Sequence, residues 1–316
     1  MIILFSFEGD ANTNYIIDWL TYYNCRFKRV DLDKEDYRNI KVFMSDSSTT
    51  IHLKLLSGEI LDFSVCDYFY VRGVGFNQPI FKNDTNLPNK VFDNYIINEF
   101  NSLTNFFYAE VNKKSVGCFY NDSHLKLLQL NHARQVGLYI CNTLITSNKH
   151  TLLDCFNESS VITKAIEDNI GTEHNNRLIV QRVQRVNYEN VEESFFPSLF
   201  QYEIDKKYEL RVFYLDGKCY TICFSSVSNN IDMRDNYSIS EYEPYKLPNA
   251  IEEKIMKFMN KMKLVSGSLD FIKSTDENYY FLEVNPNGQY DWVSRFGGYN
   301  LHQKIAYFLS SKNKGV

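Results

Sequence analysis

Asp270, Glu283 and Asn285 are spaced so that their side-chain oxygens could bind a metal ion. Asp270 lies in the segment SGSLDFI, and the other two lie in YYFLEVN. If these segments form antiparallel strands that turn near Asp276 and Glu277, Asp270 lies opposite Glu283, and opposed positions are about 5 Å apart at Cβ. Carboxylates that close repel each other unless a cation joins them, and Mg²⁺ takes oxygen ligands. The spacing is consistent with Mg²⁺ shared with a nucleotide, and also with a strand-end acid and an exposed glutamate that bind nothing.

Strict alternation divides the side chains of the second strand between two faces. One face is expected to carry Tyr280, Leu282 and Val284, and the other Phe281, Glu283 and Asn285. Pro286 has no N–H to donate to a neighbouring strand, so the strand is expected to end before it.

Strands and helices alternate in the first part of the chain, which predicts an α/β domain. The segments MIILFS and KRVDL are expected strands, with the helical pattern NTNYIIDWLTYYN between them. TTIHLKLLSGEIL predicts a hairpin that turns at Ser57 and Gly58, and NQPIFKNDTNLPNK predicts a loop.

The remainder of the chain contains three predicted helices and several strands. The first helix begins at Asn121, with capping residues at its start and an apolar face formed by Leu125, Leu128, Ala133 and Val136. The other two helices are NAIEEKIMKFMNKMKLV and LHQKIAYFLSSK. Asp216 and Gly217 predict a tight hairpin turn.

The overall composition restricts the classes of function. The 316 residues carry a net charge of −5, which disfavours a general nucleic-acid-binding role because nothing broad neutralises phosphates. The seven cysteines are scattered without a CxxC pair, which is typical of reduced thiols in a cytosolic protein. No apolar run approaches the length of a membrane span. We therefore expect a cytoplasmic protein that binds neither nucleic acid nor membrane.

The ordered blocks of this sequence resemble a known superfamily. GSLDFI followed by YFLEVNPNGQ resembles the closing metal-binding strands of ATP-grasp enzymes. Further blocks, including SFEGDANTNYIIDWL, DYFYVRGVGF, NDSHLKLLQLNHARQVGL and DMRDN, are similar to peptide maturases of the graspetide type, relatives of the microviridin ligases and especially of the grasp-with-spasm subgroup. The resemblance implies an ATP-grasp fold of α+β lobes. It also implies an N-terminal α/β domain over 1–112, a central lobe with a phosphate-covering loop over 113–198, and a C-terminal lobe over 199–316. The nucleotide would lie between the last two.

The resemblance also implies a role for individual residues. Asp270, Glu283 and Asn285 would bind Mg²⁺, and Arg211 and Arg234 would be the catalytic arginines. The residues implied to bind ATP are Lys126 and Lys164 at the phosphates, Gln201, Glu203 and Ile204 at adenine, and Glu209 at the ribose.

Several of these assignments have a simpler alternative. Lys126 could lie on a solvated helix face, and YELRV could be a half-exposed strand with cross-strand charge pairs. Arg72 could hold a carboxylate or a phosphate, or could be an edge-strand arginine. The sequence also departs from the family at Gly171, the one glycine of the expected phosphate-covering loop, and at Cys141, where family members tend to have proline.

The activity that the resemblance implies is an ATP- and Mg²⁺-dependent ligation. An Asp or Glu carboxylate of a ribosomal precursor peptide, which has a leader and a core, would be activated as an acyl phosphate. Attack by Thr, Ser or Lys would then close an ω-ester or ω-amide crosslink. The alternatives are a ligase that adds free amino acids to a protein or small molecule, and a nucleotide-gated binding protein without catalysis. The resemblance makes a homodimer plausible.

Overall fold

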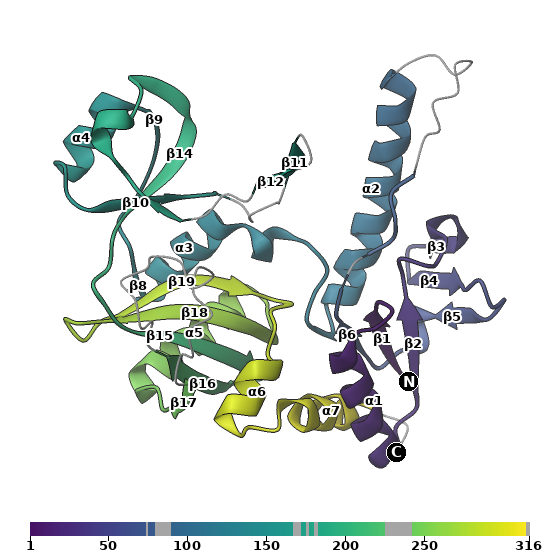
Figure 1. Cartoon of the computed structure of the whole chain (residues 1–316). Helices are drawn as coiled ribbons and strands as arrows, with labels where there is room; N and C mark the ends of the chain where they lie inside the picture. The colour runs from purple at the N-terminus through teal and green to yellow at the C-terminus, as the bar shows by residue number, and fades with distance from the viewer. Residues whose placement is uncertain are drawn as a thin grey trace. The chain divides into compact units, whose positions relative to one another are not determined.

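The computed structural model describes residues 1–73, 75–79, 90–166, 172–174, 177–179, 183–224 and 242–313. The chain divides into two units (Figure 1). The first contains Met1–Asn121, Leu264–Ser266 and Asn300–Val316, and the second contains Asp122–Lys263 and Gly267–Tyr299. Among the described residues, no helix has both the length and the apolar character needed to cross a bilayer.

The first unit is built on a four-stranded sheet in the order β2-β1-β6-β7 whose paired strands all run parallel. These strands are β1 (Ile2–Ser6), β2 (Phe27–Asp31), β6 (Tyr68–Val71) and β7 (Ser115–Val116). Every residue of β1 is buried, as its continuous apolar run predicts for a strand covered on both faces. The helix α1 (Ala11–Tyr22) connects β1 to β2 and begins at Asp10, whose carboxylate accepts a hydrogen bond from the Thr13 N–H.

Helices complete this unit. Phe5 of β1 packs on Phe107 of α2 (Lys90–Asn112), and Tyr68 of β6 packs on Phe308 of α7 (Leu301–Lys312). The long helix α2 was not identified in the sequence. The C-terminal helix α7 contacts α1 and belongs to this first unit.

A small antiparallel sheet also belongs to the first unit. Its strands are β3 (Ile40–Met44), β4 (Thr49–Lys54) and β5 (Ile60–Asp62). The hairpin predicted at Ser57 and Gly58 is confirmed, because β4 pairs with β5 and the Leu55 N–H donates to the Glu59 carbonyl at 2.8 Å.

The second unit contains a four-stranded antiparallel sheet in the order β13-β10-β14-β9. Its strands are β9 (Thr143–Asn148), β10 (Val161–Lys164), β13 (Gln184–Arg185) and β14 (Ser194–Tyr202). The helix α4 (Lys149–Phe156) covers it, and Phe156 packs edge-on against Tyr202. The short strands β11 (Thr172–His174) and β12 (Arg177–Ile179) pair with each other and form a two-stranded sheet in the described part of the chain (Figure 1).

The second sheet of this unit has six strands in the order β17-β16-β15-β18-β19-β8. The strands are β8 (Tyr139–Ile140), β15 (Lys206–Leu215), β16 (Lys218–Phe224), β17 (Tyr242–Tyr245), β18 (Ser266–Ser274) and β19 (Tyr279–Asn285). Three helices pack on it, namely α3 (Lys126–Gln135), α5 (Asn249–Lys261) and α6 (Asp291–Gly297). Asp216 and Gly217 form the predicted turn between β15 and β16, and both have positive φ, 43° and 85°. Four 3₁₀ turns also occur in the described ranges, at Tyr37–Asn39, Phe63–Val65, Asp122–His124 and Tyr188–Asn190.

The pairing of β18 with β19 confirms one prediction and corrects another. Asp270 lies opposite Glu283, as expected. The register then shifts, so that Phe271 pairs with Phe281 and Leu282 is the extra residue of a bulge. Phe281 and Val284 are both buried, at 0% and 3% exposed. Placing Phe281 on the same face as Glu283 was therefore wrong, because the bulge interrupts the alternation between them.

The helix α3 also differs from its predicted form. It begins at Lys126, after the 3₁₀ turn Asp122–His124, and no side chain caps it. Leu125, which was predicted on the apolar face, is 43% exposed, whereas Gln129 is 1% exposed. The buried face of α3 is thus set by what the helix contacts and not by its apolar residues alone.

Candidate active site

Asp270 lies on β18 beside Arg211 of β15. The guanidinium Nη1 of Arg211 donates a hydrogen bond to Oδ1 of Asp270. Burial raises the pKa of Asp270 to about 6 even though Arg211 opposes the rise, and the charge of Glu283 adds to it. Solvent still reaches 30% of the side chain. The result is a carboxylate surrounded by protein, next to a second carboxylate, at a place that a cation would stabilise.

Glu283 and two lysines from separate elements come together next to Asp270. The Nζ of Lys126, on α3, lies 3.1 Å from Oε2 of Glu283. Lys164, on β10, is half-buried, and this burial lowers its pKa, while the charge of Glu283 opposes the fall and that of Lys126 adds to it. The structure therefore places both predicted phosphate lysines within electrostatic reach of the predicted metal ligand.

Arg211 has an unused donor. Its Nε is buried and has no hydrogen-bond partner among the residues that the structure describes. The guanidinium lies over the ring of Trp292, 5.5 Å from the centroid. A guanidinium placed over an aromatic ring, with one donor left over, suits an anionic oxygen such as that of a phosphate.

Asn285 is the exposed last residue of β19, opposite Ser268. Its Oδ1 accepts a hydrogen bond from the Asn287 N–H at 2.9 Å, which leaves a second lone pair on this oxygen. The chain then passes close to β18 at Gly288, where a Cβ would lie 2.5 Å from the Cβ of Ser268. A glycine is required there because of this close approach.

The donor set fits Mg²⁺, but only with further ligands. Asp270, Glu283 and Asn285 offer oxygens alone, which Mg²⁺ prefers to nitrogen or sulfur. In the described part of the chain, no three His, Cys, Asp or Glu side chains are grouped closely enough to hold a metal by themselves. Two carboxylates and an amide would thus share the ion with phosphate oxygens and water, as is usual for Mg²⁺ bound with a nucleotide.

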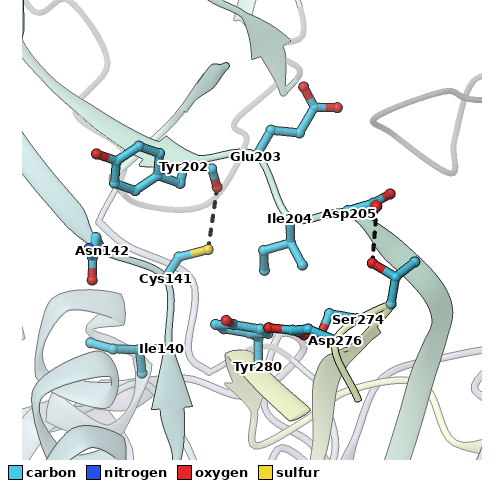
Figure 2. Close-up of a pocket in the computed structure, with 11 residues that line it drawn as sticks. Ile140, Cys141, Asn142, Tyr202, Glu203, Ile204, Asp205, Ser274, Asp276 and Tyr280 are labelled. Atoms are coloured by element: carbon cyan, nitrogen blue, oxygen red, sulfur yellow. Dashed lines mark hydrogen bonds between the residues drawn. The ribbon is translucent and has the colours of Figure 1, made fainter. Parts of the chain in front are cut away.

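A cavity of about 420 Å³ lies where β14 leads into β15 (Figure 2). Its walls include Ile204 from this connection, Cys141 and Tyr280. The Sγ of Cys141 lies 3.4 Å from the Tyr202 carbonyl oxygen, and burial raises the pKa of this thiol to about 11. The volume and the mixed apolar and polar walls suit a planar heterocycle.

The three residues predicted at adenine occupy different environments. Ile204 and Glu203 line the cavity. The carboxylate of Glu203 accepts two hydrogen bonds from Arg185, at 2.6 and 2.8 Å, and Arg185 lowers its pKa. Gln201 is not part of the lining: it is 2% exposed and donates to Oγ1 of Thr143 at 2.8 Å. The side chains of Glu203 and Gln201 are both hydrogen-bonded to other residues of the protein. Contacts with a ligand in the cavity would therefore come from backbone groups and from the side chain of Ile204.

The remaining predicted residues are only partly described. Glu209 pairs with Lys206 at 2.7 Å, and its charge also raises the pKa of Asp270, so it lies near the acidic pair. Arg234 and Gly171 lie outside the described residues. Sequence analysis did not single out Trp292 or Arg185, because neither the stacking nor the ion pair follows from local spacing.

Comparisons with known proteins concern the fold of the chain. Residues 192–309 match the family model of the RimK-like ATP-grasp domain. A search of curated proteins found no match.

Solved structures of similar fold cover nearly the whole chain. The macrocyclase MdnC from Microcystis aeruginosa MRC, bound with precursor peptide MdnA, is 22% identical with a TM-score of 0.77, and the alignment covers 98% of this chain and 100% of that one. A Chryseobacterium gregarium RiPP-associated ATP-grasp ligase, in complex with ADP and a leader and core peptide, is 19% identical with a TM-score of 0.77, covering 100% and 99%. The ATP-grasp ligase PsnB, with a minimal precursor variant, Mg and ADP, is 13% identical with a TM-score of 0.74, covering 99% and 98%.

These similarities confirm the predicted fold class. The six-stranded sheet, its helices and the four-stranded sheet are two α+β lobes of one unit, and the match to the RimK-like domain lies in the C-terminal part of the chain. The predicted enzyme class, ATP-grasp ligase, is also the class of these structural neighbours. The chain therefore has the ATP-grasp fold over its length and is similar to ATP-grasp ligases of RiPP systems.

Proposed function

We propose that this chain is an ATP- and Mg²⁺-dependent ligase that acts on a ribosomally made precursor peptide. It would activate Asp or Glu side-chain carboxylates of the peptide as acyl phosphates and join them to Thr, Ser or Lys side chains as ω-esters or ω-amides. The observation that carries the proposal is the cluster of Arg211, Lys126 and Lys164 around the acidic pair Asp270 and Glu283. The precursor peptides bound in all three of the similar structures described above support the choice of substrate.

The residues of the cluster divide into two roles. Asp270, Glu283 and Asn285 would hold Mg²⁺. ATP would supply the phosphoryl group that is transferred, and Mg²⁺ would neutralise the charge of that group. Lys126 and Lys164 would donate to phosphate oxygens. The Nε of Arg211 has no hydrogen-bond partner among the described residues, so it would be free to donate to an anionic oxygen of the ligand. Positioning and charge stabilisation of this kind provide most of the catalysis in phosphoryl transfer.

The cavity beside the β14–β15 connection would hold the base of the nucleotide. Ile204 would pack on the ring, and Glu209 would bind the ribose after exchanging its partner Lys206. We also propose, on the ordered sequence blocks, that the chain is closest to the grasp-with-spasm maturases. A cytoplasmic location is part of the proposal and is supported by the seven cysteines, all of which are free thiols.

The test is an incubation of the protein with ATP, Mg²⁺ and a short peptide encoded beside its gene. We expect ADP release that depends on the peptide, and loss of one water from the peptide for each crosslink, measured by mass spectrometry. Glu283→Gln should abolish both, whereas Glu253→Gln, an exposed acid on α5, should leave both unchanged. ADP release with a gain of peptide mass would instead identify a ligase that adds free amino acids. Nucleotide binding without any turnover would identify a binding protein.

A further inference from the structure

Gln129 is a polar residue buried at the contact between α3 and β19. Its side chain is 1% exposed. The amide makes three hydrogen bonds: Oε1 accepts from the Val284 N–H at 3.0 Å, and Nε2 donates to the Val284 carbonyl at 2.9 Å and to the Ser123 carbonyl at 2.7 Å. If the amide were rotated by 180°, its oxygen would face two carbonyls and its NH₂ group would face an N–H. In the orientation observed, the oxygen accepts one hydrogen bond and the NH₂ group donates two.

The amide of Gln129 takes the place of a neighbouring strand. The strand β8 pairs with β19 only at Tyr280 and Phe281. A residue in an antiparallel strand directs its N–H and C=O to the same edge, so the two bonds to Val284 lie on one edge of β19. Val284 is opposite Leu269 of β18 and turns both groups towards Gln129. The hydrogen bonds from Gln129 therefore fix the backbone of β19 at Val284, beyond the two residues that pair with β8.

That position lies between two predicted metal ligands. Glu283 precedes Val284, and Asn285 follows it. Lys126, one helical turn before Gln129, pairs with the carboxylate of Glu283 at 3.1 Å. A single helix face therefore holds both the side chain of Glu283 and the backbone that follows it.

We propose that Gln129 is a positioning residue for the metal site. It would hold the backbone from Glu283 to Asn285 so that these two side chains can bind the same ion. The inference rests on the proposed function, because it assumes that this segment binds Mg²⁺. Without the amide, the N–H and C=O of Val284 are buried and unpaired, and the strand must shift or admit water to pair them. Loss of a group that orients a ligand in this way typically weakens metal binding about 10- to 100-fold.

The test compares Gln129→Met, which keeps the length of the side chain but removes its hydrogen bonds, with two controls. Gln135→Met makes the same exchange at an exposed position at the end of α3. Leu130→Ala, at a residue 7% exposed, weakens the packing of α3 and leaves the hydrogen bonds between Gln129 and Val284 in place. Three quantities are measured: the exchange rate of the Val284 amide proton in the metal-free protein by NMR, the dissociation constant for Mn²⁺ in the presence of ADP by electron paramagnetic resonance, and the thermal midpoint.

We expect Gln129→Met to speed exchange of the Val284 amide proton at least about tenfold and to raise the Mn²⁺ dissociation constant about 10- to 100-fold. Gln129→Glu should behave similarly at pH 8, because a carboxylate cannot donate to the carbonyls of Val284 and Ser123. Leu130→Ala should lower the thermal midpoint while leaving Mn²⁺ binding within about twofold of wild type, as should Gln135→Met.

Two results would overturn the inference. One is Mn²⁺ binding by Gln129→Met that equals that of the wild type. The other is weakening by Leu130→Ala as large as that by Gln129→Met, since Gln129 would then contribute only general stability. A different result would contradict the proposed function itself: if the wild type shows no saturable binding of Mn²⁺ and ADP, both the proposed function and the role of Gln129 at a metal site are wrong. The Val284 exchange rate would in that case still report whether the amide holds the strand.

Discussion

Asp270→Asn should make the metal-free protein more stable while abolishing its binding of Mg²⁺ and nucleotide. The reason is the cost of ionising Asp270 in the folded state, where burial and Glu283 raise its pKa from 3.8 to about 6. A raised carboxyl pKa means that the folded state binds the proton more tightly than the unfolded state. The free energy of unfolding therefore falls as the pH rises from about 4 to about 6, and the penalty is constant above that.

The size of the effect follows from these two values. Their difference, 6 minus 3.8, corresponds to about 3 kcal/mol at about 1.4 kcal/mol for each pH unit. Solvent reaches 30% of the side chain and screens the interaction, so we expect about 1–2 kcal/mol. Asparagine avoids this penalty and still offers Oδ1 to Arg211. For a unit of this size, the gain corresponds to a rise in thermal midpoint of about 2–8 °C.

The assay is thermal unfolding followed by Trp292 fluorescence. The chain has two tryptophans, so a Trp19→Phe background restricts the signal to the second unit. We expect Asp270→Asn to raise the midpoint at pH 8 and to have little effect at pH 4, where the wild-type carboxyl is largely protonated. Mg²⁺ with ADP at about 100 times its dissociation constant should stabilise the wild type by about 2.7 kcal/mol and leave the variant unchanged.

Two outcomes would refute this reasoning. If Asp270→Asn is less stable than the wild type at pH 8, the pair with Arg211 outweighs the cost of burial, and the carboxylate is structural. If Mg²⁺ with ADP stabilises the variant as much as the wild type, Asp270 is not a metal ligand. Asp216→Asn at the β15–β16 turn is the matched control, because that carboxylate is exposed and does not line the cavity of Figure 2.

Three further predictions follow from single side chains. Lys164→Met should weaken ATP binding about 10- to 100-fold in calorimetry without destabilising the protein, because burial already disfavours the charge; unchanged affinity would exclude a phosphate contact. Trp292→Leu should slow peptide-dependent ADP release about two- to thirtyfold through loss of its stacking with Arg211, and a rate equal to that of Trp292→Phe would count against that role. Iodoacetamide at pH 8 should modify exposed Cys155 before Cys219, since burial raises the pKa of Cys219 to about 12; peptide mapping would contradict this if both reacted equally fast.

Features that depend on neighbouring residues were predictable from the sequence. The turn at Asp216 and Gly217 requires residues that tolerate positive φ, and that chemistry is local. Likewise, the apolar run of β1 and the stripe of α5 identify buried elements without further information. The pairing of Asp270 with Glu283 was predicted from strand alternation and the position of one turn. The roles of these residues in binding metal and nucleotide remain predictions.

Features that depend on distant parts of the chain were decided only by the tertiary structure. The sequence by itself determined that β19 is a strand carrying Glu283, but not that a bulge at Leu282 turns Phe281 into the core. It could not reveal that Gln129 is buried, because the backbone group that satisfies its amide is 155 positions away. Periodicity reports the solvent preference of a side chain. Burial of a polar group depends on a partner that only the folded chain brings into contact with it.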